Sequence, residues 1–340
     1  MRTRARLPRW LAFTLLPGLI GLGPRPGEAA VALTLRGVGL SLGNSPRACG
    51  LRINAVDDQV QRVDGLNLTL WNPRPSPVAQ MNGAAIGLIG PKAGRLQGLA
   101  LGGLGATAGE RIRGLAAAGF GVGSESLTGA ALGGLLVDIK RDSRGLLCAL
   151  GAARARGRLE GLGVGGLFVE AGDLRGLALG GLGVVGRRGA GLALSAGIMS
   201  VQESLTGVAL GGLVAGGGRL RGLGLSGGVV FASEALTGIA IGGLGLGSQG
   251  PVRGLAAGGL ILAAPELQGL GAGALNGVLV EGINLEDFLK IRTVNARMVG
   301  LQIGLVNYTA ELWGLQLGLV NIARNNPRWA RVLPGLNLHW

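Results

Sequence analysis

The stretch Gly176–Ala190 reads GLALGGLGVVGRRGA, and close copies of it fill the middle of the chain, as in GLALGGLGATAGERIR (98–113). Successive copies begin 15 or 16 residues apart, a spacing too regular to follow from composition alone. The chain is therefore a tandem repeat. The thirteen opening glycines are Gly83, Gly98, Gly114, Gly129, Gly145, Gly161, Gly176, Gly191, Gly207, Gly222, Gly238, Gly254 and Gly269.

Each repeat joins an apolar segment of about nine residues to a polar turn of about six, as in LALGGLGVV (177–185). Leu177 and Leu179 alternate with Ala178 and Gly180, which is the period of a β-strand. The glycine content excludes a helix, because each glycine costs about 1 kcal/mol relative to alanine. Every segment is predicted to be one strand, or two short strands bent at Gly180-Gly181.

The polar turns alternate in charge from residue 161 onward. Acidic EAGDLR (170–175) is followed by basic GRRGAG (186–191) and then by VQESLT (201–206). The full unit is thus a pair of repeats, about 31 residues long. One slip occurs over 140–158, where two basic turns follow one another.

Two architectures fit this pattern. In a parallel β-solenoid, each turn stacks on the next about 4.8 Å away, so alternating charges would build a ladder of Arg–Glu pairs. The even spacing and the charge slip suit this arrangement. In an antiparallel meander, alternate turns lie at opposite ends of the sheet.

Three features favour the meander. The apolar segments carry almost no charge on either face, whereas a soluble solenoid should expose a polar one. Nine residues nearly match the 9–11 that cross a bilayer as a tilted strand. The ending LNLHW (336–340) resembles the terminal signal of bacterial outer-membrane barrels. We predict an all-β meander closing into a shallow β-barrel, with the parallel β-solenoid as the alternative.

Composition narrows the class of protein further. Glycine accounts for 70 of 340 residues without a triplet repeat, which excludes collagen. Hydrophobic residues make up 48% and charged residues 15%, which argues against disorder. The net charge is +14, carried mainly by arginine. We interpret this as an arginine-rich rim that could meet membrane lipid or lipopolysaccharide.

The chain divides into four parts. Residues 1–30 read as a signal peptide, with a basic start over Arg2–Arg9 and an apolar run over Trp10–Gly23. Residues 31–82 are predicted as irregular strands with a proline-rich loop, 83–276 as the glycine-rich array, and 277–340 as polar repeats ending in a strand. Within the last part, 281–299 is predicted as a short helix or a longer loop.

The two ends carry motifs of their own: GLNLTLWNP (65–73), GLQIGLVNYTAEL (300–312) and GLQLGLVNIARNNP (314–327). Together with the GLALGGLG units, they resemble a family of bacterial glycine-rich surface-repeat proteins of unknown function. The resemblance covers almost the whole chain after the leader. It implies an exported bacterial protein of the cell envelope and implies no catalytic residues.

Short enzyme-like motifs occur and are attributed to chance. The GxGxxG match at 161–166 lacks the strand–helix context of a nucleotide site. The GxSxG match around Ser226 lacks a catalytic histidine, because the only histidine of the sequence, His339, lies next to the C-terminus. We therefore predict no enzyme, no catalytic residues, no cofactor, no metal ligands and no identifiable small-molecule substrate.

The charged residues give no discrete site either. Glu125, Glu203 and Glu234 occupy similar turn positions and so belong to the repeat. The arginines of ARARGR (153–158) lack the aromatic residues of a nucleic-acid surface, so no nucleic acid is expected as a partner. Cys49 and Cys148 are the only cysteines, and both pairing and oligomeric state stay open.

These observations lead to a functional expectation. The chain is predicted to be a non-enzymatic repeat protein of the cell envelope, an outer-membrane-associated β-structure at the outer membrane or cell surface of a Gram-negative-type bacterium. The alternative is a secreted or surface-tethered β-solenoid that acts as a spacer or an adhesion protein.

Overall fold

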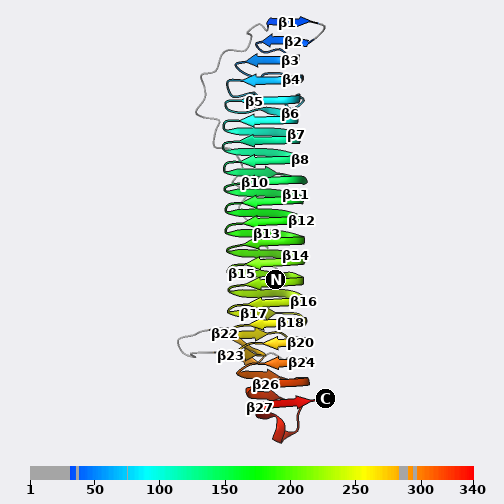
Figure 1. Cartoon of the computed structure of the whole chain (residues 1–340), viewed down its shortest axis with the longest axis vertical. Helices are drawn as coiled ribbons and strands as arrows, with labels where there is room; N and C mark the ends of the chain where they lie inside the picture. The colour runs from blue at the N-terminus through cyan, green and yellow to red at the C-terminus, as the bar shows by residue number, and fades with distance from the viewer. Residues whose placement is uncertain (1–30, 36–37, 75, 283–289, 294–296) are drawn as a thin grey trace, which may run out of the picture.

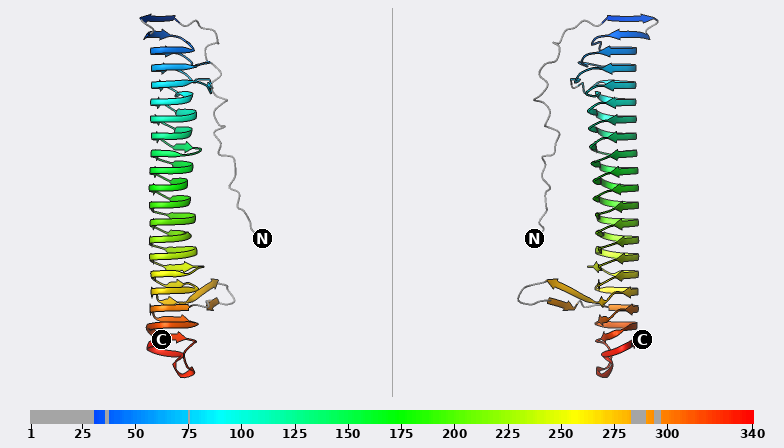
Figure 2. Two further views of the ribbon diagram at one scale, coloured as in Figure 1. Left: turned by 90° about the vertical axis from the view of Figure 1, so that its right-hand side faces the viewer. Right: turned by 60° about the vertical axis from the view of Figure 1, so that its left-hand side comes forward.

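The chain forms a long rod of stacked β-coils, a parallel β-solenoid of about 18 turns (Figures 1 and 2). The computed structural model describes residues 31–340 except 36–37, 75, 283–289 and 294–296. The predicted signal peptide lies outside the described residues. The alternative fold is thus confirmed, and the predicted antiparallel meander and barrel are wrong.

Neighbouring strands along the chain pair parallel and in register through the array. Phe168 pairs with Gly183 and Gly180 pairs with Ser195, one coil further on. The chain can climb in this way because each apolar segment is two short strands rather than one long strand. The break falls at Gly181-Leu182, one residue beyond the bend that the sequence offered as its second option.

In the middle of the rod, a typical coil consists of one bent strand followed by a two-residue turn. Some coils are instead divided into two strands at their charged turn. The N-terminal strands are β1 (Val31–Leu35), β2 (Val38–Leu42), β3 (Arg47–Asn54), β4 (Arg62–Thr69) and β5 (Gln80–Gly87). The array continues with β6 (Lys92–Gly102), β7 (Gly105–Ala118), β8 (Gly121–Gly133), β9 (Leu136–Ile139), β10 (Ser143–Ala149), β11 (Ala152–Gly165), β12 (Phe168–Gly180), β13 (Gly183–Ser195), β14 (Ile198–Gly211), β15 (Val214–Ser226) and β16 (Val229–Gly242). The remaining elements are β17 (Gly245–Ser248), β18 (Val252–Gly258), β19 (Ile261–Ala263), β20 (Glu266–Ala272), β21 (Leu275–Asn276), β22 (Val278–Gly282), β23 (Lys290–Thr293), β24 (Arg297–Ile303), β25 (Val306–Thr309), β26 (Glu311–Ala323), the 3-10 helix η1 (Arg328–Ala330) and β27 (Val332–His339).

The glycines that open the repeats stack in a single column along the rod. All thirteen have positive φ, and the column extends to Gly50, Gly65, Gly300 and Gly314 at the two ends. An added Cβ on Gly191 would stand 2.1 Å from the carbonyl oxygen of Gly176. Because both the conformation and the space exclude a side chain, glycine is required where each coil bends. We call this set the glycine column.

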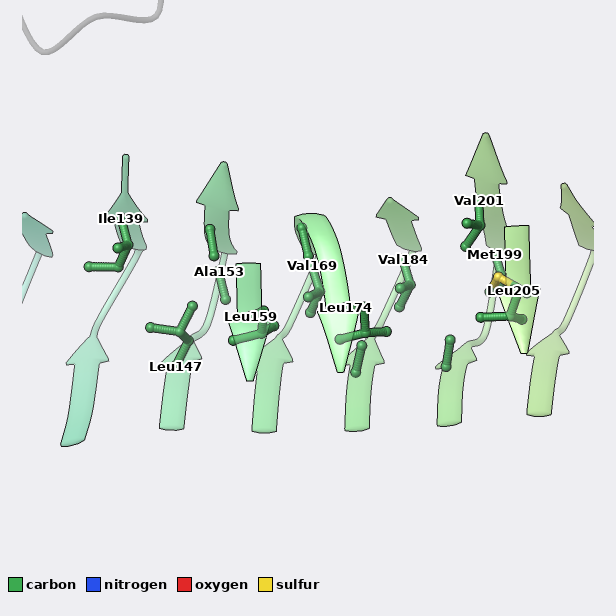
Figure 3. Close-up of a cluster of buried hydrophobic side chains, with 14 of the residues drawn as sticks. Ile139, Leu147, Ala153, Leu159, Val169, Leu174, Val184, Met199, Val201 and Leu205 are labelled. Atoms are coloured by element: carbon green, nitrogen blue, oxygen red, sulfur yellow. The ribbon is translucent and has the colours of Figure 1, made fainter. Parts of the chain in front are cut away.

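The interior of the rod is narrow and built mainly from small aliphatic side chains. In the coil of β12, Val169, Ala171, Leu174 and Ala178 point inward and are at most 5% exposed. Side chains from successive coils stack along the axis (Figure 3). Alanine and glycine fill the side of the core next to the glycine column, and this allows the walls of so short a coil to approach each other.

Each coil has a further corner that carries its charged turn. These turns stack along the rod, as the solenoid alternative predicts. Arg187 lies 3.2 Å from Asp173 in the coil before it. Arg188 lies 2.5 Å from Glu203 in the coil after it. Such exposed pairs contribute little stability each, but alternating signs penalise a shift by one coil. We call this set the charged corner.

The slip over 140–158 is also accommodated, since its basic residues pair in both directions along the rod. Lys140 binds Glu125, and Arg156 binds Asp138. Glu160 accepts from Arg144 at 2.9 Å and from Arg158 at 3.2 Å. The hydrogen bond from Arg144 is the main reason that the pKa of Glu160 is lowered.

Antiparallel strands close both ends of the rod. At the N-terminal end β1 pairs antiparallel with β2, and at the C-terminal end β27 pairs antiparallel with β26. The terminal sequence LNLHW therefore ends a cap rather than a barrel strand. His339 packs edge-on against Trp313, with ring centroids 5.4 Å apart. Each cap covers peptide groups that an open solenoid would leave unpaired.

Polar side chains replace the aliphatic core near both ends. Arg52 is fully buried and donates to Asp57 and Asn67. At the other end Asn276 donates to Asn307 at 2.7 Å, and Asn307 donates to Asn321 at 2.7 Å. We call these three residues the asparagine ladder.

An antiparallel hairpin of β22 and β23 leaves the rod near its C-terminal end (Figure 2). Residues 281–282 and 290–293 belong to this hairpin and 297–299 belong to β24. The rest of the segment 281–299, for which the sequence predicts a short helix or a longer loop, lies outside the described residues. Among the described residues, no helix is long and apolar enough to cross a membrane.

Candidate contact surface

One side of the rod is lined by aliphatic side chains over seventeen coils. After each glycine of the column, the first and third residues point outward, and the second points into the core. None of the outward residues is charged and none is buried. We call this set the apolar face. Its members are Leu51, Ile53, Leu66, Leu68, Ala84, Ile86, Leu99, Leu101, Leu115, Ala117, Ala130, Leu132, Leu146, Cys148, Leu162, Val164, Leu177, Leu179, Leu192, Leu194, Val208, Leu210, Leu223, Leu225, Ile239, Ile241, Leu255, Ala257, Leu270, Ala272, Leu301, Ile303, Leu315 and Leu317.

The local sequence explains why the face is flat. Parallel pairing in register places Leu177 beside Leu192 and Leu179 beside Leu194, so identical positions form straight rows. Neighbours in a row shield one another's sides and leave the tips open to solvent, which is why most members are half-buried. Ile239 and Ile241 remain 45% and 42% exposed.

A further apolar row runs along the bend that follows the apolar face. The exposed fraction of its side chains ranges from 43% at Phe120 to 77% at Leu150. We call this set the corner row. It consists of Leu88, Leu104, Phe120, Leu135, Leu150, Leu167, Leu182, Leu213, Leu244, Leu260, Leu305 and Leu319.

The apolar surface is unusually large for a single chain. Sixteen spacings of about 4.8 Å and a width of about four residues give the face roughly 1,000 Å². The largest apolar patch on an ordinary monomer is about 300–600 Å². A shallow hollow of about 590 Å³ lies on the face where Ala117 and Cys148 replace leucine, beside Leu101, Leu132 and Leu150.

Arginines border the apolar face on the side of the glycine column. Each comes directly before a column glycine, two residues from the first row of the face. Arg113, Arg175, Arg221 and Arg253 are exposed, and they make no ion pair among the described residues. We call these four the border arginines. Arg144 occupies the same position but binds Glu160.

The carboxylates, by contrast, are almost all engaged. Of the aspartate and glutamate side chains that the structure describes, every one except Asp142 takes part in an ion pair. Asp142 accepts from the backbone N–H of Arg158 at 2.8 Å. The unpaired charge of the described rod is therefore basic, and part of it runs along one edge of the apolar face.

The enzyme-like motifs have structural roles. Gly161 belongs to the glycine column, and β11 leads into β12 rather than into a helix. Ser226 is buried, and its Oγ accepts from the backbone N–H of Gly228 at 3.1 Å. Neither motif has the geometry that its chemistry requires.

The charged candidates lie on the charged corner. Glu125, Glu203 and Glu234 bind Lys140, Arg188 and Arg219 of neighbouring coils. The described residues include no group of three side chains suited to a metal ion.

The two cysteines lie far apart along the rod, and both are free. Cys49 is in β3 and exposed, whereas Cys148 is in β10 and half-buried on the apolar face. Strands β4 to β9 separate them (Figure 1).

Comparison with known proteins adds no relative: no protein-family model, no curated protein and no solved structure matches this chain.

The apolar face was not predicted as one surface, and neither were its border arginines; composition predicted only an arginine-rich rim. The signal was the aliphatic identity of the first and third positions after the column glycines, with Cys148 as the exception.

Proposed function

We propose that the chain is an exported, non-enzymatic protein of the bacterial cell surface, a stiff spacer that holds on to its target through the apolar face. The observation that carries this proposal is the unbroken face of 34 uncharged outward positions. A rod with only a spacing role would stay soluble with polar side chains there. A contact role accounts for an exposed apolar surface of this size.

Export and surface location are supported by the sequence. The basic and apolar leader over residues 1–30 is typical of a secretory signal. The resemblance of the repeats and the two ends to bacterial surface-repeat proteins points the same way.

Cys49 allows a direct test of surface location. It is exposed and free, so a membrane-impermeant maleimide should label it on intact cells that express the full chain with Cys148→Ser. The Cys49→Ser, Cys148→Ser chain is the unlabelled control. Labelling only after the outer membrane is permeabilised places the chain in the periplasm. Labelling only after complete lysis would contradict the proposal that the chain is exported.

The contact role is tested by removing apolar surface without disturbing the core. Leu179→Gln with Leu194→Gln changes two outward positions of the apolar face. Val185→Gln with Ile198→Gln is the matched control, because these residues are 39% and 49% exposed on another side of the coil. The first pair should release the chain from the cell pellet into the medium, and the second should not. Equal retention of both variants contradicts a contact role for the face.

A further inference from the structure

We infer that the surface held by the apolar face is a lipid bilayer containing anionic phospholipid, with the face seated among the acyl chains and the border arginines on the lipid phosphates. This inference rests on the proposed function, because it names the partner of the same face. Three observations lead to it: the shape of the face, its uncharged character and the charge along its edge.

The shape suits a fluid, extended partner. The face is straight, about one side chain deep, and continues along the whole stack of coils. A bilayer interface accepts an apolar surface of any length to a depth of about 5–10 Å. Leucine, isoleucine and valine supply the apolar layer, and no charged side chain among the 34 positions would have to be desolvated.

The arginines along the edge of the face favour a partner with negative charge. The border arginines lie two residues from the first apolar row, where a seated rod would bring them to headgroup depth. Arg175, Arg221 and Arg253 have no protein partner among the described residues. Each guanidinium group is therefore free to bind two oxygens of one phosphate at the same time. An anionic interface provides such oxygens along its whole extent.

A second copy of the chain is the competing occupant, and it fits the charge less well. Two apolar faces could pack together as sheets do, and the area would be ample for a dimer. The described carboxylates of such a copy are already bound to arginine or lysine, apart from Asp142. A dimer would therefore leave the border arginines without an anionic partner.

Vesicle flotation tests the inference on the full chain. The vesicles are phosphatidylcholine alone, or phosphatidylcholine with three parts in ten of phosphatidylglycerol. The chain should float with the anionic vesicles and much less with the neutral ones. Arg175→Gln with Arg221→Gln and Arg253→Gln should weaken binding to the anionic vesicles roughly a hundredfold, about fivefold for each arginine.

The matched control removes the same charge from the charged corner. Arg95, Arg188 and Arg219 each bind a glutamate there, and changing all three to glutamine should alter vesicle binding by less than about threefold. Circular dichroism of each variant before flotation verifies that the strands are intact. Leu179→Gln with Leu194→Gln should lower binding to both kinds of vesicle.

Each contrary outcome has a distinct meaning. Equal binding to neutral and anionic vesicles, or no effect of the border variant, overturns the anionic-lipid inference. Absence of vesicle binding, with a dimer by light scattering that the Leu179→Gln, Leu194→Gln pair dissociates, makes a second copy the occupant and leaves the contact role of the face intact. If the face variant and its control are also retained equally on cells, the proposed function fails as well.

Discussion

Gly176 lies directly against Gly161 of the preceding coil, so that a Cβ built on Gly176 would be 2.2 Å from the Gly161 carbonyl oxygen. The same contact repeats along the glycine column, and at φ +127° Gly176 has a conformation that other residues rarely adopt. Contact and conformation together fix the bend that separates the apolar face from the border arginines.

The first prediction is that Gly176→Ala destabilises the rod by roughly 3 kcal/mol, because it combines an unfavourable φ with a backbone clash. The measurement is the shift in the urea unfolding midpoint. Gly224→Ala is the control. It lies between Ala209 and Ala240 in the register, and its new Cβ would meet only side-chain atoms at 3.6 Å or more. It should be neutral or stabilise by about 0.5 kcal/mol, and an equal loss in both variants would contradict the account of the column.

The second prediction concerns acid. Hydrogen bonds, chiefly from Arg144, lower the pKa of Glu160 in the folded chain, so its contribution to stability is present above the unfolded pKa, near 4.5. That contribution disappears as pH falls through the lower, folded pKa. The difference in unfolding midpoint between the wild type and Glu160→Gln should therefore be largest at pH 7, shrink as pH falls below about 4.5 and vanish once pH is below the folded pKa. A difference that stays constant between pH 7 and pH 3 would contradict this linkage.

The third prediction is for the asparagine ladder. Asn307→Ala should cost about 2–4 kcal/mol, because it removes the donor to Asn321 Oδ1 and to the Leu317 carbonyl oxygen, and the acceptor for Asn276. Urea unfolding provides the measurement. Gln97→Ala removes a half-buried amide with no side-chain hydrogen bond among the described residues and should change stability by less than about 0.5 kcal/mol.

The fourth prediction is for the buried ion pair near the N-terminal end. Arg52→Leu should destabilise the chain by about 3–5 kcal/mol, since Asp57 would remain buried without its cation. Replacing both Arg52 and Asp57 with leucine should recover part of that loss. A double variant less stable than Arg52→Leu would show that hydrogen bonds from Asn54 and Thr69 to Asp57 matter more than the ion pair.

Much of the fold was predictable from the repeat. The opening glycines became the glycine column, and the alternating turns became the charged corner. Of the two options for the apolar segment, one strand or two strands bent at Gly180-Gly181, the second lies within one residue of the observed bend. These features depend only on neighbours one coil apart, and a periodic sequence displays those neighbours directly.

The choice between barrel and solenoid was wrong for a physical reason. An apolar segment without charge on either side fits a membrane strand, and it equally fits a strand with its core side on Ala178 and an exposed apolar side on Leu177 and Leu179. The pattern of hydropathy is the same in both. The bend at Gly181-Leu182 distinguishes the solenoid from the barrel. It divides the nine-residue segment into two short strands and turns the chain, so that the following residues begin the next coil along the rod.

The alternating charged corner has a consequence for how the length of this rod can change. Arg188 lies beside Ser204, which lies beside Arg219. Removing that single coil would bring two arginines together, whereas removing two coils keeps opposite signs adjacent. The described rod ends in an antiparallel strand on each side, β1 and β27, and the repeats of the sequence set the number of coils between them. Opposite signs stay adjacent when the length changes by a coil pair, about 31 residues or roughly 10 Å. A single added coil needs residues that pair in both directions, as those of 140–158 do.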